Sequence, residues 1–505
     1  MGKARVFAPR WLLTLIGVSA LLLAMPIASA QARVNRALLV GMDQFVTKAS
    51  TYPSSINNVY AMQAAFQGSL EPFGAILIPD QPISSGEALA ALIRQTFSEA
   101  AEDDVSYFYI STHGVYDGVS EPALLLSDGT TEARMTAREL EAAFDGIAGT
   151  KVLLIDACNS GAFIGKGESD FPAEVAFLGN DFKVLCSSGA HEESWYWSTA
   201  DSEDDRQRQG AFYFTQALAQ SLSATCNTPA DQNRDGAVTL SELYEYLLKN
   251  HAASTPQVYP QTDDFVVFRY DPAVSLPASQ TSPIQDVTFS GTVLGNGGGD
   301  VSVEFTAVRP VRVAYQVVYY RGGQWRFGEA KLMYDMEEQF GAAGDQAGAV
   351  SAGRKARTIS LKPQSAGNYG YVLVQLVTRE NGKLTVHAGR ILCVPPASGR
   401  LDVAVSSPDL YRVSDERELP IFVRHKYPCQ LSVAIVDAQG TIVRRLCHRQ
   451  STRPLGLEPA GSTFYWDGTD KKGDPVPPGT YYVRASGAMD ELSYTTIGAA
   501  MQVLE

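Results

Sequence analysis

The stretch VLLIDACNSGAF, residues 152–163, carries most of the information about the fold. Apolar residues run straight into Asp156 and Cys158, and small, turn-forming residues follow. A short continuous apolar run of this kind predicts a strand that is buried on both faces. The strand would end at Asp156 and present the Cys158 thiol above the edge of a sheet. Three interpretations of Cys158 stay open at this point: a core residue, half of a disulfide, or a nucleophile.

The segments around this strand alternate between strand and helix patterns from residue 36 to about residue 270. Apolar runs predict strands at 36–41, 75–78, 105–111, 151–156 and 182–188. Helical spacing predicts helices at 56–66 and 84–100, and Thr136 with Glu139 forms a capping box that opens a further short helix. Buried strands separated by helices predict a parallel α/β sheet covered on both faces.

A second predicted strand also ends in a reactive residue. The sequence YFYISTHG, residues 107–114, places His113 just after the 105–111 strand. Ligands and catalysis in open parallel sheets lie beyond the carboxyl ends of the strands, so His113 and Cys158 should emerge at the same edge. A nearby base makes a thiol a good nucleophile, and Gly114 allows the backbone to approach closely and donate to an oxyanion. Each residue alone is better explained as structural, but the pair predicts catalysis.

Three motifs carry a resemblance to a known family: STHG (111–114), DACNSG (156–161) and GAFYFTQAL (210–218). Over residues 36–270 the chain resembles the caspase-like cysteine peptidases, and among them the metacaspase-like branch. The resemblance implies a mostly parallel sheet flanked by helices and peptide-bond hydrolysis through a thioester. Cys158 would attack the carbonyl, His113 would polarise it or protonate the leaving amine, and the N–H groups of Gly114 and Cys158 would form the oxyanion hole.

The same resemblance implies a pocket for an Arg or Lys residue before the cut. Asp156 and Ser111 match pocket positions of the family, but Asn58 stands where an aspartate is expected. This departure weakens the prediction of basic specificity, and Glu192 or Glu193 is a candidate to compensate. Asp156 has the simpler alternative of capping a turn. Cleavage after aspartate is disfavoured, because such a pocket needs arginines where these positions offer acids.

The sequence DQNRDGAVTLSE, residues 231–242, fits a calcium-binding loop. Gly236 allows the sharp turn, and Val238 anchors the loop. A single loop favours a Ca²⁺ ion that stabilises the domain over one that controls activity, and an Asx-rich turn without metal is the alternative. The predicted ligands are Asp231, Asn233, Asp235, the Ala237 carbonyl, Thr239 and Glu242.

The first residues predict a cleaved signal peptide. Lys3, Arg5 and Arg10 precede an apolar run at 11–24, and residues 28–30 read ASA. The run is short for a membrane anchor, so we expect cleavage after Ala30 and a secreted or extracytoplasmic protein. The remaining chain has 38 Lys plus Arg against 55 Asp plus Glu, a net charge of −17, which argues against nucleic acid or an anionic membrane as partner.

The six cysteines are too few over this length for a disulfide scaffold. Cys429 and Cys447 are candidates to bridge two strands of one domain, and the sequence leaves this open. A functional Cys158 must stay out of any such pair. The cysteines are Cys158, Cys186, Cys226, Cys393, Cys429 and Cys447.

The C-terminal half loses its helical signals after a linker-like stretch, VSLPASQTSPIQ. Alternating strand patterns predict two β-sandwiches. The stretch FYWDGTDKKGDPVPPGTYYVRASG (464–487) resembles the immunoglobulin-like module of flagellar hook-capping proteins, with Trp466 in its core. The two β-domains would position the enzyme, bind a surface or partner, or assist export. The predicted domains are a signal peptide (1–30), a peptidase domain (31–273), a linker (274–285), a β-sandwich (286–395) and an Ig-like β-sandwich (396–505).

Together these features predict an exported cysteine endopeptidase that acts on protein or peptide substrates, cleaving after Arg or Lys. The stretch STADSEDDRQRQG (198–210) is either a solvated loop or a self-cleavage site after Arg206 or Arg208. One rival is a catalytically silent scaffold whose sandwiches bind a partner or surface. The other is a peptidase of the same fold that selects Asn or small residues, since Asn58 leaves room for it.

Overall fold

A computed structural model of the chain describes residues 33–166, 176–177, 179–198, 209–250, 254–290, 298–321, 324–332, 349–361, 371–380, 383–394, 401–413, 418–425, 429–452, 460–489 and 492–504. The predicted signal peptide, its cleavage point after Ala30, and the candidate self-cleavage residues Arg206 and Arg208 lie outside the described residues.

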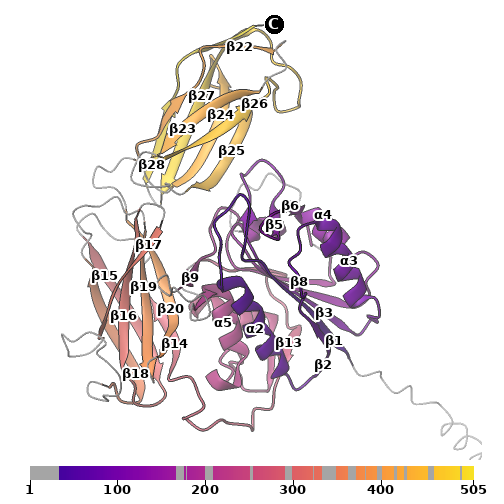
Figure 1. The fold of residues 1–505 in the computed structure, drawn as a ribbon, viewed down its shortest axis with the longest axis vertical. Helices are drawn as coiled ribbons and strands as arrows, with labels where there is room; N and C mark the ends of the chain where they lie inside the picture. Colours follow the sequence, from indigo (N-terminus) through magenta and orange to yellow (C-terminus); the bar gives the residue numbers. More distant parts are fainter. Residues whose placement is uncertain are drawn as a thin grey trace, which may run out of the picture. The chain divides into compact units, whose positions relative to one another are not determined.

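The N-terminal part is built on one six-stranded sheet with the order β12-β8-β7-β3-β1-β2 (Figure 1). Five strands are parallel, as predicted, and β12 pairs antiparallel with β8, so the sheet is mixed. The strands are β1 (Asn35–Gly41), β2 (Phe73–Leu77), β3 (Val105–Ser111), β7 (Thr150–Asp156), β8 (Phe182–Cys186) and β12 (Gln257–Tyr259).

Alternate residues of the central strands enter two separate cores, which explains their continuous apolar sequence. Phe108 and Ile155 belong to one core with α3 (Gly86–Phe97) and α4 (Ala137–Ala142). Tyr107 and Leu154 belong to the other, with α2 (Ser54–Gln67), α5 (Tyr213–Leu222) and α6 (Leu240–Asn250). Strands β3 and β7 are therefore buried from both sides, as the sequence pattern predicts.

Local signals explain where the helices begin. Both bonds of the predicted capping box are present: the Thr136 hydroxyl accepts from the Glu139 N–H at 3.2 Å, and the Glu139 carboxylate accepts from the Thr136 N–H at 2.8 Å. Helix α2 starts against the Asp43 carboxylate, which accepts the N–H groups of Ser55 and Ile56 at 2.9 and 3.1 Å. The carboxylate thus accepts hydrogen bonds from N–H groups of the first turn, which have no partner within the helix, and its negative charge favours the helix N-terminus.

Several short strands around the sheet were not predicted. They form the sheet β4-β5-β6 and the pairs β9–β10 and β11–β13. Each strand is at most five residues long, so its pattern is too short to stand out. Their bounds are β4 (Gly114–Val115), β5 (Ala123–Ser127), β6 (Glu132–Thr136), β9 (Tyr196–Ser198), β10 (Gly210–Phe212), β11 (Ala237–Thr239) and β13 (Val266–Arg269). Short 3-10 helices span η1 (Ser160–Ile164) and η3 (Ala224–Cys226).

The first β region, residues 284–393, contains the sheets β14-β15-β18 and β17-β16-β19-β20. Apolar residues from both sheets form one core between them. The first strand of the region begins inside the predicted linker, two residues before the predicted domain. The strands are β14 (Ile284–Phe289), β15 (Gly299–Ala307), β16 (Val313–Arg321), β17 (Gln324–Leu332), β18 (Gly353–Leu361), β19 (Tyr371–Glu380) and β20 (Lys383–Cys393).

The second β region, residues 404–504, contains the sheets β21-β23-β26 and β22-β29-β27-β24-β25, with β28 paired to β27. Trp466 is fully buried in its core, as predicted. The strands are β21 (Ala404–Ser406), β22 (Leu410–Arg412), β23 (Leu419–His425), β24 (Cys429–Asp437), β25 (Ile442–Thr452), β26 (Ala460–Trp466), β27 (Gly479–Met489), β28 (Leu492–Ile497) and β29 (Met501–Leu504).

Cys429 and Cys447 lie on the adjacent strands β24 and β25 but are free thiols. The strand register places Cys429 opposite Thr452 and Cys447 opposite Val433, so the two cysteines are not cross-strand partners. Among the residues that the structure describes, no helix has the length and apolar character needed to cross a membrane.

Candidate active site

The site lies where β3 and β7 end side by side. The parallel register pairs Ser111 with Asp156, and the Thr112 N–H donates to the Asp156 carbonyl at 3.2 Å. His113 and Cys158 each follow two residues later, so both emerge at the same edge of the sheet, as the sequence predicts.

Gly114 allows the two loops to touch. A Cβ atom at this position would lie 1.8 Å from the Cys158 carbonyl oxygen and 3.3 Å from the Ala157 Cβ. No side chain fits in that space, and backbone atoms cannot yield as a flexible side chain does. The histidine loop therefore lies against the cysteine loop because residue 114 is glycine.

Cys158 is partly exposed, whereas Cys186, Cys226, Cys429 and Cys447 are buried. Its Sγ–H donates to the Ser194 carbonyl at 3.6 Å. The next residue, Asn159, has a left-handed backbone (φ 59°), and its N–H donates to the Glu192 carbonyl at 2.8 Å. The 187–195 loop, which connects β8 to β9, thus packs directly against the cysteine turn.

His113 is held by the loop that follows β1. Its Nε2 lies 2.9 Å from the Ala49 carbonyl, which can only accept, so this nitrogen carries the proton. The Phe45 ring meets the imidazole edge-on, with 4.5 Å between ring centroids. Glu132 fixes the same loop by accepting the N–H groups of Val46 and Thr47 at 2.9 and 3.1 Å.

Asp156 is completely buried, and its hydrogen-bond partners are neutral. One carboxylate oxygen accepts from the Ser194 hydroxyl at 2.8 Å, and the other accepts from the Thr215 hydroxyl at 2.6 Å and the Thr215 N–H at 3.2 Å. Burial raises the pKa of Asp156 to about 6, although these hydrogen bonds oppose the shift.

Asn58 and Ser111, predicted to share a pocket with Asp156, contact each other directly. The Asn58 amide donates to the Ser111 hydroxyl at 3.1 Å, and its oxygen accepts the Phe212 N–H at 3.0 Å. Both side chains are buried. Asn58 therefore joins α2, β3 and β10, which are distant in sequence.

Glu192 holds the 187–195 loop. Its carboxylate accepts the N–H groups of Gly189 and Thr255 at 3.0 and 2.9 Å, and the Thr255 hydroxyl lies 3.3 Å away. Burial raises the pKa of Glu192, and the positive charge of Arg390 on β20 opposes this rise. Glu193 is half-buried on the same loop.

The predicted calcium loop has its oxygen-bearing side chains turned onto its own backbone. Asp231 accepts from the N–H groups of Arg234 and Gly236 at 2.7 and 3.0 Å. Asn233 and Asp235 accept the N–H groups of residues 235 and 237, both at 2.9 Å.

Glu242 does not join this set, because its carboxylate caps α6. It accepts from the N–H and hydroxyl of Thr239 at 3.0 and 2.9 Å. The described residues contain no group of three His, Cys, Asp or Glu side chains positioned to hold a metal. The Asp231, Asn233 and Asp235 oxygens suit Ca²⁺, but Glu242 would have to leave its cap to bind it.

Two neighbours of the site were missed by sequence reasoning: Ser194 and Thr215. Ser194 bonds both Cys158 and Asp156, and Thr215 bonds Asp156. These residues lie at least 36 positions from Cys158, and no local motif marks them as partners. Only the motif GAFYFTQAL, which contains Thr215, pointed to this part of the site.

The sequence matches the caspase domain family over residues 34–259 and the FlgD Ig-like domain family over residues 429–491. No curated protein matches the chain significantly. Among solved structures, caspase-1 from Spodoptera frugiperda is similar, with 15% identity and a TM-score of 0.30, covering 48% of this chain and 94% of that chain. FlgD from P. aeruginosa is similar with 20% identity and a TM-score of 0.16, covering 21% of this chain and 75% of that chain.

The caspase domain family is one of cysteine peptidases, and the matched segment contains both strand ends of the site and the 187–195 loop. The second match lies within the second β region, on β24 to β27. Residues 34–259 of this chain are therefore a caspase domain, and residues 429–491 are a FlgD Ig-like domain.

Proposed function

We propose that this protein is an exported cysteine endopeptidase with Cys158 as nucleophile and His113 as the acid–base group. The observation that carries the proposal is that a partly exposed thiol and an imidazole follow register-paired strand ends within a caspase domain. Perturbed and reactive groups gathered at one sheet edge favour catalysis over packing.

The reaction would proceed through a thioester. The Cys158 thiolate attacks the scissile carbonyl carbon, and N–H groups of Gly114 and Cys158 stabilise the resulting oxyanion. His113 gives a proton to the leaving amine as the C–N bond breaks. Water then attacks the thioester and loses a proton to His113, and the C–S bond breaks to release the acid and regenerate the Cys158 thiolate.

For specificity, we propose an Arg or Lys residue before the cut, recognised by Asp156. A carboxylate has about four acceptor sites, and in the described part of the chain Ser194 and Thr215 donate three hydrogen bonds to Asp156. A buried carboxylate without a cationic partner gains most from a substrate guanidinium or ammonium. Because the Glu192 carboxylate is engaged by Gly189 and Thr255, we give it no part in this pocket, and Glu193 stays the candidate.

A second specificity is supported by Asn58. This neutral side chain occupies the position where the resemblance leads us to expect an acid, and it already pairs with Ser111. A peptidase of the same fold that selects Asn or small residues would suit such a pocket.

The test is active-site labelling of the full-length protein with an arginyl acyloxymethyl ketone, with Cys158→Ala as control. Asparaginyl and aspartyl probes should be run in parallel, before and after light trypsin treatment to cut any zymogen loop. Arginyl labelling that needs Cys158 supports the full proposal. Asparaginyl labelling supports the second specificity. If no probe labels Cys158 under any condition, the chain is a scaffold whose β regions bind a partner or surface.

We also propose self-cleavage after Arg206 or Arg208. N-terminal sequencing would test it, since wild type but not Cys158→Ala should yield a fragment that begins at residue 207 or 209. The same fragment from Cys158→Ala would refute self-processing and point to another protease.

We further propose that Ca²⁺, bound at Asp231, Asn233 and Asp235, stabilises the caspase domain. The oxygen chemistry of these side chains supports this, and the cap made by Glu242 opposes tight binding. Calorimetry with calcium chloride tests it directly, because no heat at millimolar Ca²⁺ would refute the site.

A further inference from the structure

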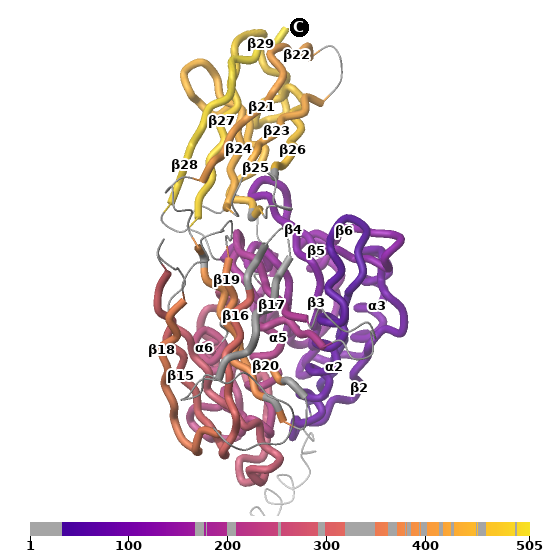
Figure 2. Tube along the Cα trace, turned by 60° about the vertical axis from the view of Figure 1, so that its left-hand side comes forward, coloured from indigo at the N-terminus to yellow at the C-terminus, as the bar shows by residue number. Residues whose placement is uncertain are grey.

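Trp195 anchors the 187–195 loop in the first β region. Its side chain is only 5% exposed and lies in an apolar cluster, here called the Trp195 cluster. The Tyr371 ring of β19 meets the Trp195 indole edge-on, with 5.1 Å between the ring centroids. Strands β16, β19 and β20 supply most of this cluster, and β20 lies beside α5 (Figures 1 and 2). Its buried members are Trp195, Tyr213, Ala314, Val318, Leu373, Val377 and Val386.

Ser194, the residue before Trp195, contacts the site. The Ser194 carbonyl accepts from the Cys158 thiol, and the Ser194 hydroxyl donates to Asp156. The Trp195 carbonyl accepts the Tyr213 N–H at 3.1 Å. Trp195, whose side chain is held by the first β region, is therefore joined directly to Ser194, whose carbonyl accepts from the Cys158 thiol. The Ser194 carbonyl lies in one planar peptide unit with the Trp195 Cα, so a shift of the Trp195 backbone would move this carbonyl with it.

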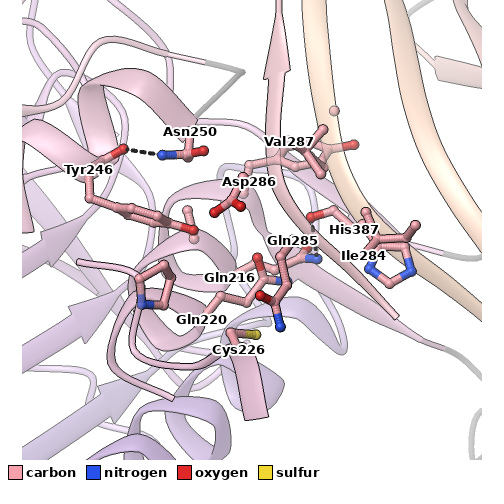
Figure 3. A pocket seen from close by; sticks show the side chains of 15 residues that line it. Gln216, Gln220, Cys226, Tyr246, Asn250, Ile284, Gln285, Asp286, Val287 and His387 are labelled. Atoms are coloured by element: carbon pink, nitrogen blue, oxygen red, sulfur yellow. Dashed lines mark hydrogen bonds between the residues drawn. The ribbon is translucent and has the colours of Figure 1, made fainter. Parts of the chain in front are cut away.

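Polar contacts fix the same junction. The Trp197 indole N–H donates to the Gln216 side-chain oxygen at 3.0 Å, and the Gln216 amide donates to the carbonyls of Val386 and His387. Figure 3 shows Gln216 beside His387 at a small cavity between α5, α6 and the first β region. No residue of the Cys158 site lines this cavity.

A further buried hydrogen bond crosses from β19 to α5. The Gln375 amide donates to the Tyr213 hydroxyl at 2.8 Å, and both side chains are buried. A Cβ at Gly389 of β20 would lie 2.7 Å from the Tyr213 ring, so the strand approaches α5 closely. The junction is thus packed and hydrogen-bonded like a domain core.

We propose that Trp195 is a positioning residue for the Cys158 thiol, and that the first β region is part of the active-site scaffold. Its catalytic consequence rests on the proposed peptidase function. The first β region acts through Trp195 and Ser194 to hold the thiol in one orientation. Displacing a reacting group by about 1 Å can lower a rate about a hundredfold.

Strand β19 offers a matched pair of variants. Val377 and Val374 are both fully buried, but Val377 belongs to the Trp195 cluster and Val374 to the core between the two sheets of the first β region. Val377→Ala should weaken the packing around Trp195. Val374→Ala should lower the free energy of unfolding by a similar amount and leave that packing unchanged. Trp195→Ala removes the anchor, and Trp195→Phe keeps an aromatic ring against Tyr371.

Two readouts are measured on the full-length protein. One is the rate of Cys158 alkylation by iodoacetamide, followed on the Cys158 peptide by mass spectrometry, which needs no peptidase activity. The other is kcat and KM on the peptide substrate that the labelling experiment identifies. Val377→Ala and Trp195→Ala should raise the alkylation rate at least about threefold and lower kcat about tenfold, with KM changed less than about twofold. Val374→Ala should stay near wild type, and Trp195→Phe should restore part of the loss seen in Trp195→Ala.

Equal effects of Val377→Ala and Val374→Ala would overturn the proposal, since they would reflect lost stability alone. Unchanged alkylation in Trp195→Ala would also overturn it. If the wild type cleaves no peptide but alkylation still separates the two valine variants, the positioning role stands and the peptidase function fails.

Discussion

Ser111 lies opposite Asp156 on the last rung of the pairing between β3 and β7. Each is followed two residues later by a reactive side chain, His113 or Cys158. Because the two parallel strands end in register, residues that follow their ends by the same number of positions lie side by side. The two loops therefore meet at one edge of the sheet. The placement of the site follows from this one rung and from the glycine that follows His113.

The first prediction concerns that glycine. Gly114→Ala should lower kcat at least about a hundredfold, because its Cβ would lie 1.8 Å from the Cys158 carbonyl and force the loops apart. Gly86→Ala is the matched control, since a Cβ there meets nothing nearer than 3.9 Å. Steady-state kinetics and thermal unfolding of both variants measure the effect. Wild-type kcat in Gly114→Ala would show that the close approach is unimportant.

The second prediction concerns the nucleophile. Cys158→Ala should abolish both probe labelling and peptide cleavage, because this thiol is partly exposed whereas Cys186, Cys226, Cys429 and Cys447 are buried. Cys226→Ala should retain both, since burial raises the pKa of the Cys226 thiol and leaves it unreactive. Labelling that persists in Cys158→Ala, mapped by mass spectrometry, would assign the nucleophile elsewhere.

The third prediction is a pH dependence of stability. Burial raises the pKa of Asp156 from 3.8 to about 6, so the unfolded state ionises first and stability is lost as pH rises from about 4 to about 6. Relative to Asp156→Asn, which does not titrate, the free energy of unfolding of wild type should fall by about 3 kcal/mol over this range. Urea unfolding of the two proteins at several pH values measures the difference.

The opposite slope, or a difference independent of pH, would contradict the raised pKa. A bound basic side chain would favour the carboxylate, so an arginyl inhibitor should bind more weakly as pH falls below about 6. In Asp156→Asn that pH dependence should disappear.

The fourth prediction concerns Ca²⁺. A loop of this type in extracellular modules binds with Kd of about 10⁻⁴ to 10⁻³ M, so 10 mM Ca²⁺ should stabilise the protein by about 1.4–2.7 kcal/mol. Thermal unfolding with Ca²⁺ and with EDTA measures this. Asp231→Ala should remove the difference and the exposed Asp271→Ala should keep it. Equal melting temperatures of wild type in both buffers would leave the loop as an Asx-rich turn.

The parallel core of the sheet was predictable from sequence because β3 and β7 are buried on both faces. Continuous apolar runs identified these strands, and the residues that follow them identified His113, Gly114 and Cys158 as neighbours. The capping box at Thr136 and Glu139 was likewise readable, since it depends only on residues three apart. Each of these features is local, or follows from local features through the rules of parallel sheets.

The remaining features depend on long-range packing. The sequence suggested Asp156 as a pocket acid, but its complete burial and bonds to Ser194 and Thr215 arise from segments up to 59 residues away. The engagement of Glu192 with Thr255 and the insertion of Trp195 beside Tyr371 have the same origin. Local propensity fixes which side chains emerge at the sheet edge. Only tertiary contacts decide how each carboxylate is solvated and which side chain holds the thiol in place, because burial and hydrogen bonding depend on neighbours that sequence spacing does not encode.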